Sequence, residues 1–176
     1  MKRLEKIIVP TDLSDHSHRA IEFGSSLAAE ARAALVIMHV ANELAAWEFY
    51  DDAFGYSGQW PLDRVLAEAA LELNRYLEPH LGVLREVPVL TKRIILGAIP
   101  GRIIALAEEE KADLIVLSPR RRQGSSWLLS AGITEKVTRM SPCPVLSVTP
   151  PLASKQWRGK FLPVSFGWLR PSAESI

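Results

Sequence analysis

The chain has 176 residues, 48% of them hydrophobic, and its 21 Lys and Arg residues nearly balance its 20 Asp and Glu residues. This length predicts one domain with a substantial core, and a formal net charge of +1 argues against a dedicated nucleic-acid binder. The single cysteine, Cys143, excludes an intramolecular disulfide and a cysteine zinc cluster, and we expect it to be a small buried residue.

Buried-strand patterns alternate with helical patterns along the chain. Strands are predicted at residues 7–9, 35–40, 87–96, 114–117 and 145–148. Helices are predicted from an N-cap at Ser14 to Ala31, from Pro61 to Pro79, from Pro100 onward, and over 127–140. The first helix has an apolar stripe that includes Phe23. This order predicts an α/β fold, an open, doubly wound, five-stranded parallel sheet with helices on both faces.

Two segments lie outside this alternation. Residues 41–60 are rich in aromatic side chains and are long for an α/β connection, so they form a self-packed surface loop, a lid or a partner surface. We divide the chain into a domain at residues 1–150 and a basic-aromatic tail at 151–176. The tail is either a partly ordered arm packed on its own subunit or a neighbour, or an arm that docks on a membrane surface or a protein. The chain has no apolar run long enough to cross a membrane and opens directly into a strand pattern, which favours a cytoplasmic protein.

The loop after the fourth predicted strand is the leading candidate for function. It reads SPRRRQG over residues 118–124, so three arginines (Arg120, Arg121 and Arg122) follow the point where the apolar strand stops. Ligands of open parallel sheets bind beyond the carboxyl ends of the strands, and guanidinium groups bind phosphate bidentately. The arginines therefore bind an anionic ligand or form a solvated or dimer-facing basic edge.

Three motifs, in order, resemble the universal stress protein (UspA-like) family. They are IIVPTDLS at residues 7–14, GAIP with ADLIV at 97–100 and 112–116, and ITEKV with SPCPVL at 133–137 and 141–146. The resemblance covers roughly residues 3–150. It implies a five-stranded parallel sheet of the adenine nucleotide alpha hydrolase type, a cytoplasmic stress-response role, and a homodimer that pairs near Val145 and Val148. In one branch of the family it also implies ATP at the strand ends, with magnesium.

In that branch an aspartate after the first strand contacts the base and ribose of the nucleotide. Asp12 matches it, flanked by Pro10 and Thr11, and a carboxylate there accepts hydrogen bonds from hydroxyl or amine groups. The alternative is that Asp12 only caps local backbone. Val40 matches an apolar residue of the base pocket, and the alternative for Val40 is a place in the core.

The phosphate loop departs from the family pattern of Gly, two residues, Gly, nine residues, Gly, then Ser or Thr. Alignment on Thr134, Glu135 and Lys136 puts those four positions at Ser118, Arg121, Ala131 and Gly132. The candidate site also includes Leu117 before them and Ile133 and Thr134 after them. None of the three glycines is present, and glycine in such a loop permits positive φ and close approach of the backbone to phosphate. We therefore expect the backbone cradle to be lost, or to be rebuilt from Arg120, Arg121 and Arg122.

The sequence gives no acid–base pair that favours catalysis, and His16 and His18 are expected to be solvated. The leading hypothesis is a non-catalytic, stress-response regulatory dimer whose nucleotide site is absent or rebuilt, with a protein partner at residues 41–60 or the tail. The alternative is an ATP- or AMP-binding switch with slow hydrolysis that uses Asp12 and the arginine loop. No metal ligands are assigned.

Overall fold

The computed structural model describes residues 3–41, 62–119 and 132–149. Several predicted features lie outside these ranges: residues 42–60 of the aromatic segment, Arg120 to Arg122, the predicted helical residues 127–131 with Ala131, and the tail. Ala41, the first residue of that segment, instead ends a strand. In chain order, the elements are β1 (Lys6–Thr11), α1 (His18–Ala31), β2 (Ala34–Ala41), α3 (Leu62–Leu77), the 3₁₀ helix η1 (Glu78–His80), α4 (Leu81–Leu84), β3 (Val89–Leu96), α5 (Ile99–Glu109), β4 (Leu114–Leu117), α6 (Ile133–Met140) and β5 (Val145–Ser147).

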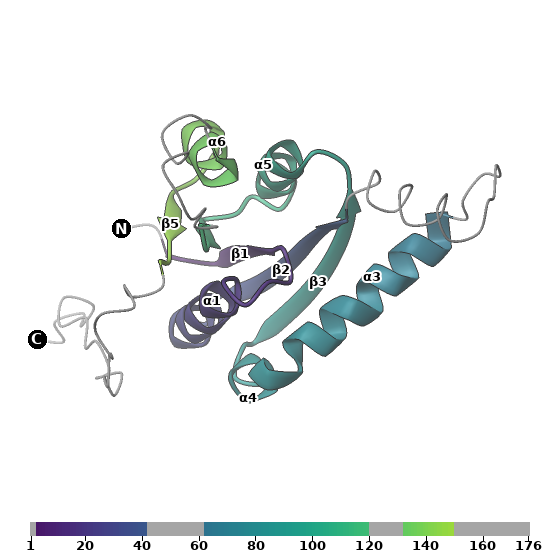
Figure 1. Cartoon of the computed structure of the whole chain (residues 1–176). Coiled ribbons are helices and arrows are strands. Elements are labelled where there is room, and N and C mark those ends of the chain that lie inside the picture. Colours follow the sequence, from purple (N-terminus) through teal and green to yellow (C-terminus); the bar gives the residue numbers. More distant parts are fainter. Residues whose placement is uncertain (1–2, 42–61, 120–131, 150–176) are drawn as a thin grey trace, which may run out of the picture.

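The five strands form one parallel sheet in the order β3-β2-β1-β4-β5, which confirms the predicted fold class. Figure 1 shows α1, α3 and α4 on one face of this sheet and α5 and α6 on the other. From β1 the chain continues to β2 and β3 on one side, and it then returns to β4 on the other side. The strand order therefore reverses between β1 and β4, and this switch point is where open α/β sheets bind ligands.

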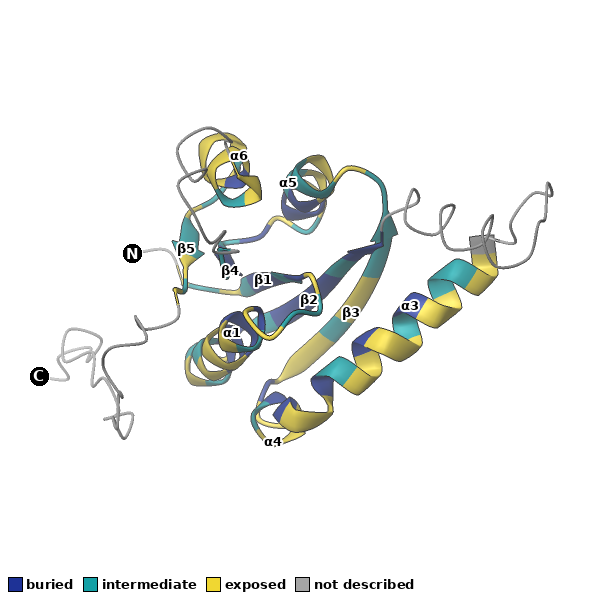
Figure 2. Cartoon of the chain, viewed as in Figure 1, coloured by how far each residue is buried: buried dark blue, intermediate teal, exposed yellow. Residues whose placement is uncertain are grey.

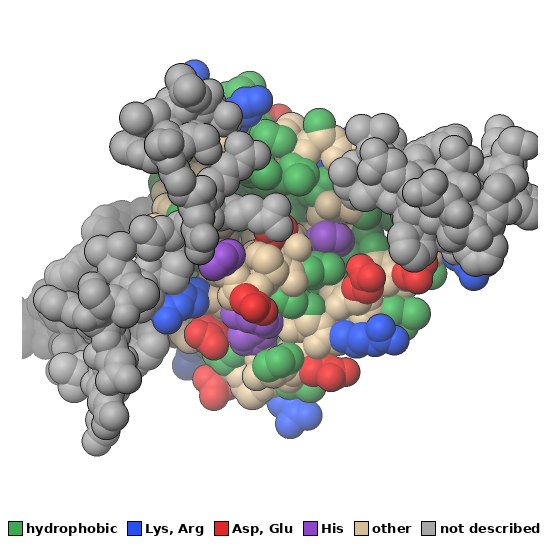
Figure 3. All heavy atoms as spheres, in the orientation of Figure 1, with side chains coloured by type: hydrophobic (Ala, Val, Ile, Leu, Met, Phe, Trp, Pro, Cys, Tyr) green, Lys and Arg blue, Asp and Glu red, His purple; other side chains and the backbone are tan. Residues whose placement is uncertain are grey.

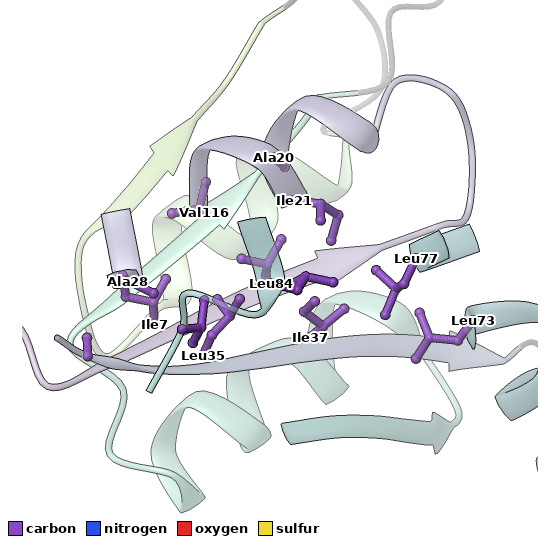
Figure 4. Packing of buried hydrophobic residues seen from close by; sticks show 13 residues of the cluster. Ile7, Ala20, Ile21, Ala28, Leu35, Ile37, Leu73, Leu77, Leu84 and Val116 are labelled. Carbon is purple, nitrogen blue, oxygen red and sulfur yellow. The ribbon is translucent and has the colours of Figure 1, made fainter. Parts of the chain in front are cut away.

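The central strand β1 separates two apolar cores. Ile7 and Val9 pack with α1 and α3, whereas Ile8 packs with α5 and α6 on the opposite face, and all three side chains are fully buried. Figure 4 shows the first of these cores, with side chains of α1 and α3 meeting those of β1 and β2. A strand buried on both faces needs an unbroken apolar run, which the sequence supplies.

The outer strand β3 is much more exposed than its neighbours (Figure 2). Its side chains include Val89, which is 57% exposed, and the charged residues Lys92 and Arg93. Arg93 reaches Glu110 at the end of α5, with 2.9 Å between the guanidinium Nη2 and the carboxylate Oε1. Charged side chains on an edge strand discourage pairing with another chain.

Two details of the first helix differ from expectation. The helix begins at His18 with Ser17 as its N-cap, three residues later than the predicted cap at Ser14. The reason is that residues 14–17 form a separate turn, in which the N–H of Ser17 donates to the carbonyl of Ser14. The hydroxyl groups of Ser14 and Ser17 both bind Asp12, and Ser17 makes no side-chain cap hydrogen bond. Phe23, assigned to the apolar stripe, is 37% exposed, and the buried positions are instead filled by its neighbours Ile21 and Gly24.

A glycine forms the turn between β3 and α5. Gly97 has a φ of +125°, which L side chains rarely adopt, and a Cβ there would lie 2.8 Å from Nε of Arg102. This turn leads directly into α5, which begins at Ile99 with a proline in its first turn. Among the described residues, no helix is both long and apolar enough to cross a membrane.

We predict that Gly24→Ala destabilises the fold by about 1–3 kcal/mol, because the new methyl group overpacks the core. Its Cβ would lie 2.5 Å from Cγ2 of the fully buried Val9, so α1 and β1 would have to move apart. Urea unfolding measures the loss. The matched control is Gly101→Ala in α5, where a Cβ meets no atom within 4 Å and the change should be neutral or stabilising. Equal effects of the two substitutions would contradict this packing account.

Candidate functional site

The candidate site lies where β1 and β4 end at the switch point of the sheet. Thr11 closes β1 and Leu117 closes β4. Both side chains are buried, Thr11 at the end of its strand and Leu117 in the core under α5 and α6. Pro10 is half-buried and Val40 is buried in the same core as Leu117, which supports the reading of Val40 as a core residue.

Asp12 is the central polar group of this edge. Its Oδ1 accepts hydrogen bonds from the hydroxyl groups of Ser14 and Ser17, both at 2.5 Å, and from the backbone N–H of Ser14 at 3.1 Å. The backbone N–H of Asp12 in turn donates to Oγ of Ser17 at 3.4 Å. The contact with the Ser14 N–H shows that Asp12 binds local backbone. Together, these contacts also fix the orientation of an exposed carboxylate at the sheet edge, where a ligand can reach it.

The backbone directly after Asp12 is strained. Leu13 has a φ of +59°, in the left-handed region that costs a non-glycine residue about 1 kcal/mol. Its N–H donates to Oγ1 of Thr11 at 3.0 Å, and its side chain packs against the core on the α1 face. Strained backbone of this kind persists only where surrounding contacts hold it in place, and it is common at binding and active sites.

Two side chains that sequence reasoning did not assign to the site support this turn. His39 on β2 donates from Nδ1 to the carbonyl of Thr11 at 3.0 Å, because that carbonyl can only accept. Tyr76 on α3 donates its hydroxyl to the carbonyl of Ser14 at 3.0 Å. The ring of Tyr76 stacks on His18, with centroids 4.3 Å apart and planes 11° apart. The sequence signal for these residues was weak, since each lies far along the chain from Asp12 or belongs to an apolar stripe.

His18 was expected to be solvated, but it contacts a second histidine. Its Nδ1 lies 2.6 Å from Nε2 of His80, which is 5% exposed, so the two imidazoles share a hydrogen bond. His16 precedes α1, so helix periodicity does not relate it to His18, and periodicity gave no indication of the partner on η1. Figure 3 shows histidine and acidic side chains gathered on this face of the molecule.

The phosphate side of the site departs from the family pattern in the described residues as well. The Ser118 hydroxyl donates to the carbonyl of Val148 at 3.0 Å, so it holds β5 against β4. Gly132 is the N-cap of α6 and makes no side-chain cap, while Ile133 is exposed and Thr134 is half-buried.

Cys143 is half-buried rather than fully buried, and its backbone is hydrogen-bonded to the Ser141 hydroxyl. Among residues 3–41, 62–119 and 132–149, no cluster of three or more metal-ligating side chains occurs.

We predict that Tyr76→Phe costs about 1 kcal/mol at neutral pH, since it removes the hydrogen bond to Ser14. Burial raises the pKa of Tyr76 from 10.0 to about 12, so at alkaline pH the unfolded chain loses this proton first. The contribution of Tyr76 to stability is therefore full below pH 10.0 and is lost as the pH rises toward about 12. Urea unfolding at neutral and alkaline pH should show a smaller alkaline loss for Tyr76→Phe than for wild type. Equal losses would contradict the burial of this phenol.

The comparisons with known proteins agree with this fold. A model of the universal stress protein family matches residues 3–149. Universal stress protein YxiE of Bacillus subtilis is 29% identical over 144 residues, which are 81% of this chain and 97% of the relative. A solved universal stress protein in complex with cAMP has a TM-score of 0.58 at 24% identity and covers 85% of this chain and 100% of its own. The universal stress protein from Archaeoglobus fulgidus in complex with dAMP has a TM-score of 0.52 at 19% identity, covering 83% and 98%.

The sheet order, the motifs at both ends of the domain and the family match over 3–149 agree: the chain belongs to the universal stress protein family.

Proposed function

We propose that this protein is a non-catalytic regulatory binding protein whose ligand is an adenine nucleoside or its monophosphate. The ligand binds where β1 and β4 part, and the cytoplasm is its expected place of action. The observation that carries the proposal is the Asp12 carboxylate, which is exposed at the switch point and oriented there by Ser14 and Ser17. A pre-oriented carboxylate recognises sugar hydroxyls or an exocyclic amine with little loss of side-chain freedom.

The nucleoside half of the site is the part that this chain retains. The turn after Thr11 is held from three sides, by His39 on β2, by Tyr76 on α3 and by the Ser17 hydroxyl at the start of α1. Rigid elements of the fold thus position Asp12, and the strained backbone at Leu13 is consistent with a turn kept for binding.

The triphosphate half is the part that this chain has changed. Arg121 and Ala131 stand where the family pattern has glycine, and Pro119 removes a backbone N–H from the loop. The Ser118 hydroxyl is engaged with Val148, and Gly132 offers no hydroxyl to a phosphate. A ligand with one phosphate needs less of such a cradle than ATP does. The two solved relatives with cAMP and dAMP hold ligands of that kind. Arg120, Arg121 and Arg122 lie outside the described residues, and we propose that they contact this phosphate by side chains.

We predict that cAMP and AMP bind this protein and that ATP with magnesium binds no more tightly than they do. Isothermal titration calorimetry of the full chain with each ligand measures the difference. Asp12→Asn keeps an oxygen acceptor for Ser14 and Ser17 but removes the charge, so we expect about 5- to 100-fold weaker binding of all these ligands.

The matched control is Asp63→Asn, an exposed aspartate in the first turn of α3, which should bind cAMP as wild type does. Tight binding of ATP with measurable hydrolysis would overturn the proposal in favour of a nucleotide-triphosphate switch. Absence of binding by every adenine ligand would overturn it in favour of a site with another role.

We also propose that the protein is a homodimer that pairs through β5. This strand lies at the edge of the sheet, opposite β3, and the side chains of Val145 and Leu146 are only half-buried. Unlike β3, β5 carries no charged residue that would discourage pairing.

Light scattering coupled to size exclusion tests this assembly. We expect a mass twice that of the chain, which is 19.5 kDa, maintained on dilution through the micromolar range. A constant mass of 19.5 kDa at every concentration would contradict the dimer.

A further inference from the structure

The contact between α1 and η1 brings together two imidazoles that face each other. Nδ1 of His18 and Nε2 of His80 are 2.6 Å apart, which is a hydrogen bond between two ring nitrogens. Such a bond requires a proton on one nitrogen and a lone pair on the other. If both imidazoles are protonated, both nitrogens carry a hydrogen and the bond cannot form. The observed contact is therefore compatible with one protonated imidazole at most.

The surroundings of the pair disfavour a second proton. His80 is buried, and burial together with the neighbouring His18 lowers the pKa of His80 below its ordinary value. Glu22 on α1 has the opposite effect and raises the pKa of His80, because its Oε1 lies 4.0 Å from Nδ1 of His80. On the His18 side, Asp15 lies 3.9 Å from Nε2, and the neutral ring of Tyr76 from α3 stacks on the imidazole.

The pair is continuous with the turn that holds Asp12. His18 is the first residue of α1 and follows Ser17, whose hydroxyl binds the Asp12 carboxylate. Tyr76, which stacks on His18 and lies near His80, also holds the carbonyl of Ser14 in the same turn. A change at the imidazole pair therefore acts on the start of α1 and on the backbone that orients Asp12.

We propose that His18 and His80 form a proton-sensitive latch, which holds the Asp12 turn in its binding conformation near neutral pH and releases it when both imidazoles are protonated. The latch itself is a property of the free protein. Its effect on ligand binding rests on the proposed function, since it regulates that same site.

The direction of the pH dependence follows from linkage. Because the folded chain holds the His80 pKa below its unfolded value, the unfolded chain binds the proton more readily. The stability that the pair contributes is therefore fully present above the ordinary histidine pKa of about 6.5 and is lost as the pH falls below it. The open form of the latch gains in population over the same range.

The first arm of the test needs no ligand. In the full chain, NMR spectra of the histidine side chains should show His80 titrating at a lower pH than in the urea-denatured chain. The backbone amide signals of residues 12–17 should shift with the same midpoint. If His80 titrates as it does in the denatured chain, or if the turn amides do not follow it, the latch is wrong.

The second arm measures binding of cAMP, whose phosphodiester keeps one charge throughout, at about pH 7.5 and about pH 5.5. We expect wild type to bind about fivefold or more weakly at the lower pH, a coupling in the usual allosteric range. His80→Gln retains a side-chain amide for His18 but does not titrate in this range, so its affinity should be nearly independent of pH. Exposed His16 provides the control, and His16→Gln should keep the dependence of wild type.

The two arms separate the two proposals. If cAMP binds at neither pH, the proposed function fails, and the NMR titration alone decides whether the latch exists. If cAMP binds but His80→Gln keeps the full pH dependence of wild type, the regulatory role of the latch is overturned while the proposed function stands.

Discussion

The full burial of Ile7, Ile8 and Val9 in β1 is the constraint on which the rest of this structure depends. Ile7 and Val9 face one core and Ile8 faces the other, so helices must cover both sides of the sheet. Right-handed connections achieve this only if the chain winds outward from β1 in both directions. The parallel neighbours β1 and β4 therefore lead into helices on opposite faces of the sheet. Asp113 strengthens this pairing at the other end of the strands, where its carboxylate accepts the N–H groups of Glu5 and Lys6. The candidate site at the carboxyl ends of β1 and β4 is thus a consequence of how the core is divided between the two faces of the sheet.

The turn after β1 connects this constraint to function. Its acceptor, Asp12, is held by hydroxyl groups of its own segment, and its backbone is held by side chains from β2 and α3. A turn with so many partners has little freedom, which suits a site that must recognise a small ligand without reorganising. The same contacts are the route by which the proposed latch acts, since the imidazole pair lies next to Ser17 and Ser17 binds the carboxylate.

Much of the fold was predictable because periodicity and burial agree along the chain. The apolar run at β1 is fully buried as expected, and those at β2 and β4 are buried except at His39 and Leu114. Helix α3 ends before Pro79, where a proline disfavours further helix. The N-cap of α1 was misplaced because Ser14 and Ser17 are equally good caps by type. Asp12 binds the hydroxyl groups of both, and the turn from Ser14 to Ser17 moves the start of the helix to His18.

The site was less predictable than the fold. Asp12 was found through its place at the end of a buried strand, a signal that is local in sequence. The contact between His18 and His80 joins residues 62 positions apart, and no pattern along the chain distinguishes such a pair from two solvated histidines. On the phosphate side, the missing glycines predict the loss of a backbone cradle for phosphate. They do not determine which groups bind an anion in its place.

The proposed function places the ligand where β1 and β4 part. Mapping of backbone amide NMR shifts on addition of cAMP tests this placement, because the shifts locate the bound ligand. We expect the largest shifts on residues 11–14 after β1 and on Ser118 after β4, whereas β3 and the amino ends of the strands should stay unchanged. Shifts concentrated on β3 or on the amino ends of the strands at saturating ligand would contradict it.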